Sequence, residues 1–108
     1  MNTYINNLTT HLIQKNHYTD LFARLGDWRA CLRRIKDDLL FGDIRDMSPG
    51  KLGEIMCSFE QGEVELLQAD FNDCTNYSGD CKEYLREIVS LCLATVITLR
   101  IDREMDRR

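Results

Sequence analysis

Residues 88–101 read IVSLCLATVITLRI, and this stretch decides the kind of fold that the chain can adopt. A helix built from it is apolar around most of its circumference, so it has no polar side to turn toward water. Polar residues at Ser90, Thr95, Thr98 and Arg100 interrupt the stretch, and it is shorter than the roughly 20 residues that cross a bilayer. The segment therefore predicts a helix in the middle of a bundle or in an oligomer interface.

Two helices are expected in the first part of the chain. Apolar residues at helical spacing predict an amphipathic helix over residues 2–16. The apolar residues of 21–39 then step by four and three in turn, which predicts one continuous second helix. Thr19 is the expected N-cap of this helix, and Gly42 is its expected end.

The second part of the chain predicts two more helices. Ser48 followed by Pro49 is a strong start signal for a helix that should run to Asn72. Residues 73–80 are polar and predict a turn before the last helix, and residues 101–108 are expected to be a solvated helix end. No segment alternates as strands do, so residues 1–108 are expected to form a single-domain all-α bundle of about four helices.

The composition fits this expectation and limits the partners. A chain of 108 residues with 44% hydrophobic and 30% charged residues has room for one compact core but not for a second module. The net charge of −4 lacks the broad positive field that drives binding to duplex nucleic acid. Residues 1–17 show no secretory signal, so we expect a cytoplasmic protein with no membrane partner.

The five cysteines are an odd number without the spacing of a disulfide framework, so reduced thiols are expected. Cys31, Cys57 and Cys92 lie in helical apolar patterns, where cysteine packs as a small hydrophobe. Cys74 and Cys81 bracket a short loop that a disulfide or a metal ion could close.

Self-association is expected from the same apolar helix. Residues 88–99 should be the most buried element, but three neighbouring helices of this size leave much of its circumference uncovered. A two-fold dimer is the simplest way to cover the rest.

Three glutamates break the apolar pattern. Glu63 lies four residues after Phe59 and three before Leu66, so it projects from the apolar stripe, and Glu60 lies beside it. Glu87 approaches both if the third and fourth helices pack antiparallel. Because Mg²⁺ takes oxygen ligands and keeps several waters, the three carboxylates predict a magnesium site. The alternative is that Glu63 reaches water at the edge of the stripe or pairs with an arginine.

Arg29, Arg33 and Lys36 share one face of the second predicted helix and could bind phosphates or an acidic partner. The alternative is a solvated face that Asp37 and Asp38 balance.

Residues 59–67 read FEQGEVELL, and residues 84–94 read YLREIVSLCLA. Together these segments resemble the all-α MazG-like nucleoside triphosphate pyrophosphohydrolases, over about residues 48–103. In that family an E-E-x-x-E helix and an E-x-x-D helix hold Mg²⁺, and an activated water cuts between the α and β phosphates. The resemblance therefore implies a helical nucleotide-binding protein that uses magnesium.

The residues match the two motifs only in part. Glu60 and Glu63 correspond to the second and third acids of the first motif, and Glu87 corresponds to the first acid of the second. Phe59 and Ser90 stand where the family has Glu and Asp, so two expected ligands are absent. A member that binds nucleotide without turnover fits this pattern as well as an enzyme does.

Two hypotheses for function follow. The first is a MazG-like nucleotide-binding protein or Mg²⁺-dependent pyrophosphohydrolase, with Glu63 in the catalytic role. Its metal ligands would be Glu60, Glu63 and Glu87, and its substrate-binding residues would be Trp28, Arg29, Arg33 and Lys36. Trp28 lies in the apolar seam, which favours core packing, although a ring at a pocket rim can also contact a base. The second is a small acidic helical inhibitor or adaptor without catalysis, of the sort that mobile genetic elements carry, whose charged face docks on a partner protein.

The resemblance predicts release of pyrophosphate from nucleoside triphosphates in the presence of Mg²⁺. Substitution Glu63→Gln removes the carboxylate charge at nearly constant volume, so turnover should fall by about 100-fold or more if this group assists the attacking water. Pyrophosphate release from a panel of nucleoside triphosphates, measured with and without Mg²⁺, tests this. If the unsubstituted protein shows no turnover and no Mg²⁺-dependent nucleotide binding, the nucleotide hypothesis is wrong.

Overall fold

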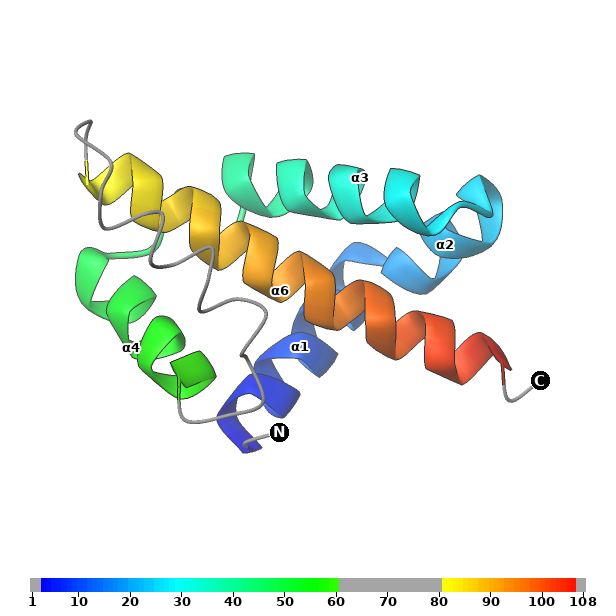
Figure 1. Ribbon diagram of the computed structural model, residues 1–108, viewed down its shortest axis with the longest axis horizontal. Coiled ribbons are helices and arrows are strands. Elements are labelled where there is room, and N and C mark those ends of the chain that lie inside the picture. Colours follow the sequence, from blue (N-terminus) through cyan, green and yellow to red (C-terminus); the bar gives the residue numbers. More distant parts are fainter. Residues whose placement is uncertain (1–2, 61–80, 107–108) are drawn as a thin grey trace.

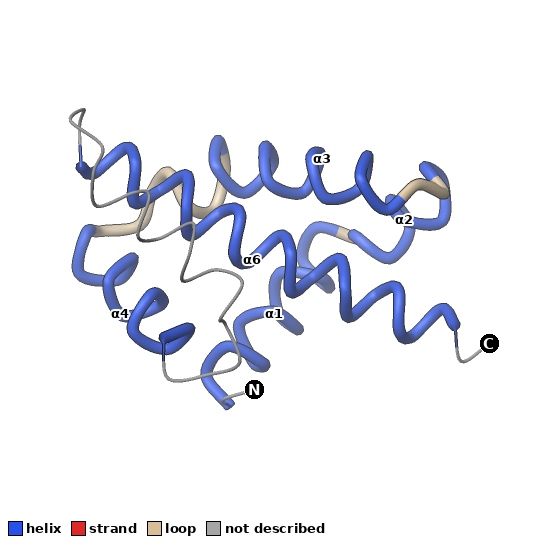
Figure 2. Tube along the Cα trace, viewed as in Figure 1, coloured by secondary structure: helices blue, strands red, loops and turns tan. Residues whose placement is uncertain are grey.

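The computed structural model describes residues 3–60 and 81–106, which form five helices (Figure 1). They are α1 (Thr3–Asn16), α2 (Tyr18–Leu25), α3 (Trp28–Phe41), α4 (Pro49–Glu60) and α6 (Cys81–Asp106). These two ranges contain no strand (Figure 2), so the predicted all-α class is confirmed.

The helix α6 is the axis of the molecule. Its 26 residues extend over about 39 Å, close to the longest dimension of 43 Å. Each of the other four described helices packs against it, with α3 along one side and α1 and α4 along the other (Figure 1). The prediction that residues 88–101 lie in the middle of a bundle is therefore confirmed.

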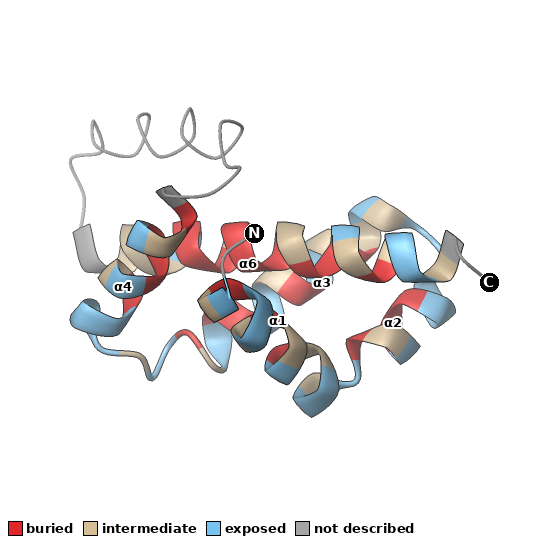
Figure 3. Cartoon of the chain, turned by 90° about the horizontal axis from the view of Figure 1, so that it is seen from below, coloured by how far each residue is buried: buried red, intermediate tan, exposed pale blue. Residues whose placement is uncertain are grey.

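Buried residues follow α6 and the sides of the neighbouring helices that face it (Figure 3). Leu93, Ile97 and Ile101 are fully buried, whereas Leu91 is half-buried and Leu99 is 39% exposed. The chain thus covers much of the surface for which a dimer was expected, and self-association stays a prediction. None of the described helices is both long enough and apolar enough to traverse a bilayer.

The predicted continuous helix over residues 21–39 is wrong, because the chain breaks at Gly26 and Asp27. Gly26 adopts a left-handed conformation with φ of 64°, and its N–H donates to the carbonyl of Phe22 at 3.0 Å. The Asp27 side chain accepts a hydrogen bond from the N–H of Arg29 at 3.2 Å and starts α3. A glycine stop and an aspartate cap therefore outweigh the apolar periodicity that continues across them, and Leu25 is left exposed.

The predicted N-cap at Thr19 is also wrong. The first helix ends at Asn16, and α2 begins at Tyr18 after His17, which adopts a left-handed conformation with φ of 55°. The carbonyl of His17 accepts the N–H groups of Asp20 and Leu21 at 3.1 and 3.3 Å, so Thr19 lies inside the first turn. The left-handed backbone of His17 thus starts α2 without the side-chain cap that was expected from Thr19.

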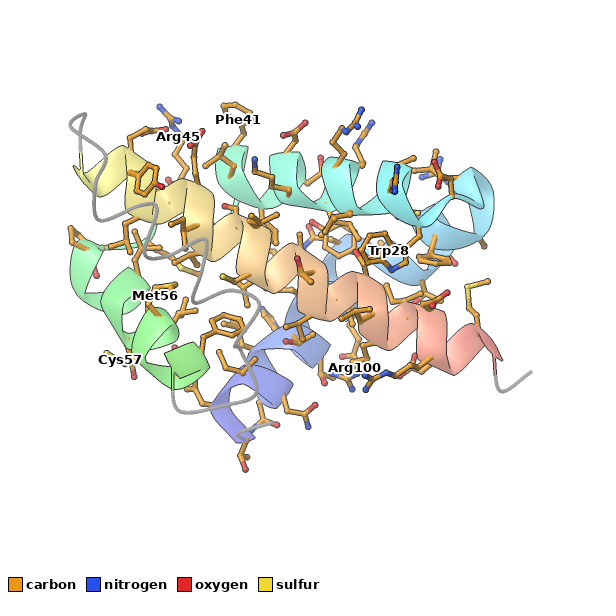
Figure 4. All side chains as sticks on the ribbon, viewed as in Figure 1. Trp28, Phe41, Arg45, Met56, Cys57 and Arg100 are labelled. Atoms are coloured by element: carbon orange, nitrogen blue, oxygen red, sulfur yellow. The ribbon has the colours of Figure 1, made fainter. Side chains whose placement is uncertain are left out.

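The start of α4 is as predicted. The Ser48 hydroxyl accepts the N–H of Lys51 at 3.2 Å, and Pro49 is the first helical residue. The interpretation of Cys57 as a core residue is wrong, since it is exposed on the outer side of α4 (Figure 4), whereas Cys31 and Cys92 are buried; all three are free thiols. The predicted continuation of this helix to Asn72 and the loop between Cys74 and Cys81 lie outside the described residues.

The end of α6 is less solvated than expected. The helix continues to Asp106, and Ile101 is fully buried instead of belonging to a solvated tail. The Arg100 guanidinium donates to the Thr10 hydroxyl at 2.6 Å and to the Asn6 carbonyl at 3.3 Å, which joins α6 to α1. These contacts hold the last turns against the bundle.

A carboxylate between α3 and α4 holds the end of α1. Asp43 pairs with the Lys15 ammonium and accepts a hydrogen bond from the Asn16 amide at 3.3 Å. Burial by itself raises the pKa of Asp43, but the hydrogen bonds from Lys15 and Asn16 and the positive charges of Lys15 and His11 outweigh burial and hold the pKa below its usual range. The ionised carboxylate is therefore stabilised by folding.

Substitution Asp43→Asn should lower the free energy of unfolding at neutral pH by about 0.5–1.5 kcal/mol. A pKa that is lower in the folded protein than in the unfolded chain stabilises the fold above the unfolded value, and this stabilisation is lost as the pH falls through the folded value. The difference between the two proteins should therefore be constant above about pH 5 and shrink below about pH 4. Urea unfolding at a series of pH values measures it.

Asp46→Asn is the matched control, since Asp46 is exposed in the same turn. It should change the unfolding free energy by less than about 0.5 kcal/mol. An Asp43→Asn effect that persists unchanged to the lowest pH would show that the charge is not its cause.

Candidate functional site

The orientation of α3 is fixed by its apolar residues. Asp27 caps the first turn, and Cys31, Ile35 and Leu39 then recur one turn apart, each fully buried. Because this row faces the core, the residues on the opposite side of α3 face outward. The cations predicted to bind substrate lie on that outward side.

We call Arg29, Arg33 and Lys36 the basic face. Arg29 and Arg33 are exposed and Lys36 is half-buried. The three follow one another at spacings of four and three residues, so they form one row along the helix. No ion pair between described side chains engages any of them.

Asp37 and Asp38, which were expected to balance the charge of the basic face, form no ion pair with it. Asp38 pairs with Arg34 at 3.3 Å, on another side of α3 from the basic face. Asp37 is exposed, and none of the ion pairs between described residues joins it to a cation of the basic face. The local charge of the basic face is therefore positive in a chain whose net charge is −4.

An aromatic residue stands at the end of the same helix. Phe41 is 68% exposed, the highest value among the large exposed hydrophobic residues of the described chain. Phe41 projects on the side of α3 turned away from α6 (Figure 4), and Arg45 is exposed in the turn that follows this helix. Phe41 lies seven residues after Arg34, so it shares the side of α3 that carries Arg34 and Asp38 instead of the side that carries the basic face.

Trp28 does not belong to this surface. It is half-buried and packs against the core, on the side of α3 that faces α6 (Figure 4). The interpretation of Trp28 as a core residue is confirmed, and its assignment to a substrate site with the basic face stays a prediction.

The predicted magnesium site falls largely outside the described residues. Glu63 and the side chain of Glu60 lie outside them, and Glu87 is exposed on α6. Over residues 49–60, α4 starts beside the start of α6 and runs in the same general direction (Figures 1 and 3). The antiparallel arrangement that would bring Glu87 toward the end of that helix is not seen in this part of the chain.

The two positions that align with the acids of the second motif, Glu87 and Ser90, face different surroundings. Glu87 is exposed, whereas Ser90 is 0% exposed and its hydroxyl has no hydrogen-bond partner in the part of the chain that the structure describes. One turn earlier on the same side, the Arg86 Nη1 donates to Glu83 at 3.1 Å while its Nε is buried without a partner. Within residues 3–59 and 83–105, no three His, Cys, Asp or Glu side chains group to hold a metal ion.

A pocket that we did not predict lies between the start of α2 and α3. Its volume is about 490 Å³, within the range of small-molecule sites. Asn16 and Leu21 form part of its wall. The polar and charged side chains that line it are His17, Tyr18, Asp20, Arg24, Arg34 and Asp38.

Tyr18 is the most unusual residue of this pocket. It is 1% exposed, and its hydroxyl is buried with no hydrogen-bond partner among the described residues, which costs about 1–3 kcal/mol. Burial and the negative charges of Asp38 and Asp43 raise the pKa of Tyr18 far above its usual value, so the hydroxyl stays protonated. The tyrosine therefore keeps a protonated hydroxyl at neutral pH, and this hydroxyl is enclosed in the protein.

The sequence offered little sign of this pocket. Tyr18 sits next to an apolar pattern and is most simply interpreted as a core residue. The pocket depends on the left-handed backbone at His17, which costs of order 1 kcal/mol in a non-glycine residue and has no local sequence signal. Only the break at Gly26 has a sequence signal, because glycine commonly ends a helix. This break lets α2 pack beside α3.

Comparison with protein-family models, curated proteins and solved structures finds no match for this chain.

Proposed function

We propose that this chain is a small helical binding protein that docks an acidic segment of a partner protein on the basic face of α3. The observation that carries the proposal is the row formed by Arg29, Arg33 and Lys36, which no described carboxylate pairs. The proposal corresponds to an adaptor or inhibitor without catalysis.

The charge of the basic face supports an acidic partner. Arginine guanidinium groups present planar forks of donors that match carboxylates in bidentate geometry. Desolvating such pairs at an interface favours the correct partner and disfavours cationic ones. In a chain with a net charge of −4, a local positive row also orients an approaching acidic segment toward α3.

The aromatic ring at the end of α3 supports a protein partner rather than a free anion. Phe41 is 68% exposed at the end of α3, and aromatic residues are among the side chains enriched at the centres of protein interfaces.

Two finer expectations belong with this proposal. The free thiols of Cys31, Cys57 and Cys92 support a cytoplasmic location, where thiols stay reduced. The pyrophosphohydrolase suggested by the MazG resemblance remains a prediction, because two of its three carboxylates lie outside the described side chains.

A charge reversal on the basic face tests the proposal. Arg33→Glu should weaken binding of a fluorescent poly-glutamate peptide about tenfold at low salt, and the loss should shrink at high salt as screening increases. Arg103→Glu is the matched control, since Arg103 is also an exposed arginine and the change of net charge is the same. Fluorescence anisotropy gives the dissociation constants, and circular dichroism confirms that both variants are helical.

The control should bind within about twofold of the unsubstituted protein. Equal weakening by both variants would show that only net charge matters and would contradict the proposal. Binding of short inorganic polyphosphate but not of the peptide would show that the face recognises phosphate instead of an acidic protein.

A further inference from the structure

A second row of residues runs along α3, apart from the basic face. It consists of Ala30, Arg34, Asp37 and Phe41, which follow one another at spacings of four, three and four residues. Residues at these spacings lie one above the other on a helix, and we call this row the outer stripe. Since each residue turns the helix by about 100°, the outer stripe is centred about 100° around α3 from the basic face.

The outer stripe is open to solvent. Phe41 is 68% exposed, Arg34 and Asp37 are exposed, and Ala30 is half-buried. None of the ion pairs between described residues engages Asp37. The other described helices lie on the side of α3 that faces α6 (Figure 1). A large ring and an unpaired carboxylate are thus left one turn apart on an uncovered side of the helix.

The order of the four residues is self-complementary. Along the helix it reads small apolar, positive, negative and large apolar. A second α3 that runs antiparallel, about a two-fold axis between positions 35 and 36, meets this order in reverse. Ala30 then faces Phe41 of the second copy, Arg34 faces Asp37 of the second copy, and the axis repeats both contacts.

We propose that this chain forms a two-fold dimer by antiparallel pairing of the outer stripes. The short side chain of Ala30 leaves room for the ring of Phe41, whose apolar surface is then removed from water. The Arg34 guanidinium keeps its ion pair with Asp38 and has further N–H donors for Asp37 of the second copy. The pairing uses none of the cations of the basic face and does not rest on the proposed function.

The charges favour a second copy over another kind of partner. A uniformly acidic surface would be repelled by Asp37, and a uniformly basic one would be repelled by Arg34. The reversed order of charges that satisfies both is present on the chain itself. This surface also differs from residues 88–99 of α6, from which self-association was expected.

Sedimentation velocity of the whole chain measures the association. One pair of 14-residue helices is a small contact beside the roughly 1,200–2,000 Å² of stable interfaces, so the dissociation constant should be of order 50 μM. Over about 5–500 μM, the protein should therefore change from mostly monomer to mostly dimer. Phe41→Ala removes the ring from both ends of the contact and should weaken the dimer about tenfold.

Two charge reversals test the register of the pairing. Arg34→Glu places two acids opposite each other, and Asp37→Arg places two arginines opposite each other. Each variant alone should therefore weaken the dimer by about 30-fold or more. In a mixture of the two variants every arginine again faces an acid, so a heterodimer should form with an affinity within about threefold of the unsubstituted dimer.

Glu54→Arg is the matched control. It makes the same change of net charge as Asp37→Arg at an exposed position of α4, across α6 from α3 (Figure 1). It should leave the dissociation constant within about twofold, since it lies outside the outer stripe. Circular dichroism confirms that each variant is helical.

The other outcomes contradict the proposal. A protein that stays monomeric up to about 500 μM does not pair through this surface. Dimers that Arg34→Glu and Asp37→Arg leave unchanged would place the interface elsewhere, and equal weakening by Glu54→Arg would show that only net charge matters. Single variants that stay monomeric when mixed would show that the two stripes do not meet in this register.

Discussion

The packing of the other helices on the inner side of α6 is the interaction on which the rest of the structure depends. Leu93, Ile97 and Ile101 recur one turn apart on this side and are fully buried, and Ile35 and Leu39 of α3 belong to the same core. Each such side chain contributes about 1.5–3 kcal/mol when it leaves water. Since α3 must turn its apolar row toward α6, its cations are presented to solvent, and the same constraint therefore positions the basic face.

Much of this fold could be predicted because it follows from local signals and apolar periodicity. The hydroxyl of Ser48 and the ring of Pro49 act within one turn, and the apolar stretch 88–101 forms a stable helix in water only where other helices cover it. Periodicity failed where a backbone conformation competes with it. Gly26 stops a helix whose apolar spacing continues across it, and His17 reverses the chain with no signal that distinguishes it from its neighbours.

The candidate sites divide in the same way. Arg29, Arg33 and Lys36 could be assigned to one face from spacing alone, because they lie on a single helix. The pocket around Tyr18 could not, since it requires α2 to pack beside α3 after two left-handed residues. The burial of single residues could not be predicted from the sequence either. Glu87 and Ser90 lie three residues apart, yet Glu87 is exposed and Ser90 is fully buried.

Native-state amide hydrogen exchange along α6 tests the central claim most directly. If the bundle depends on this helix, the amides of residues 88–101 should exchange only through global unfolding, with an opening free energy equal to that measured by urea. The amides of α2, an eight-residue helix between two left-handed residues, should open at a lower free energy. Exchange in residues 88–101 that is as fast as exchange in α2 would contradict this account.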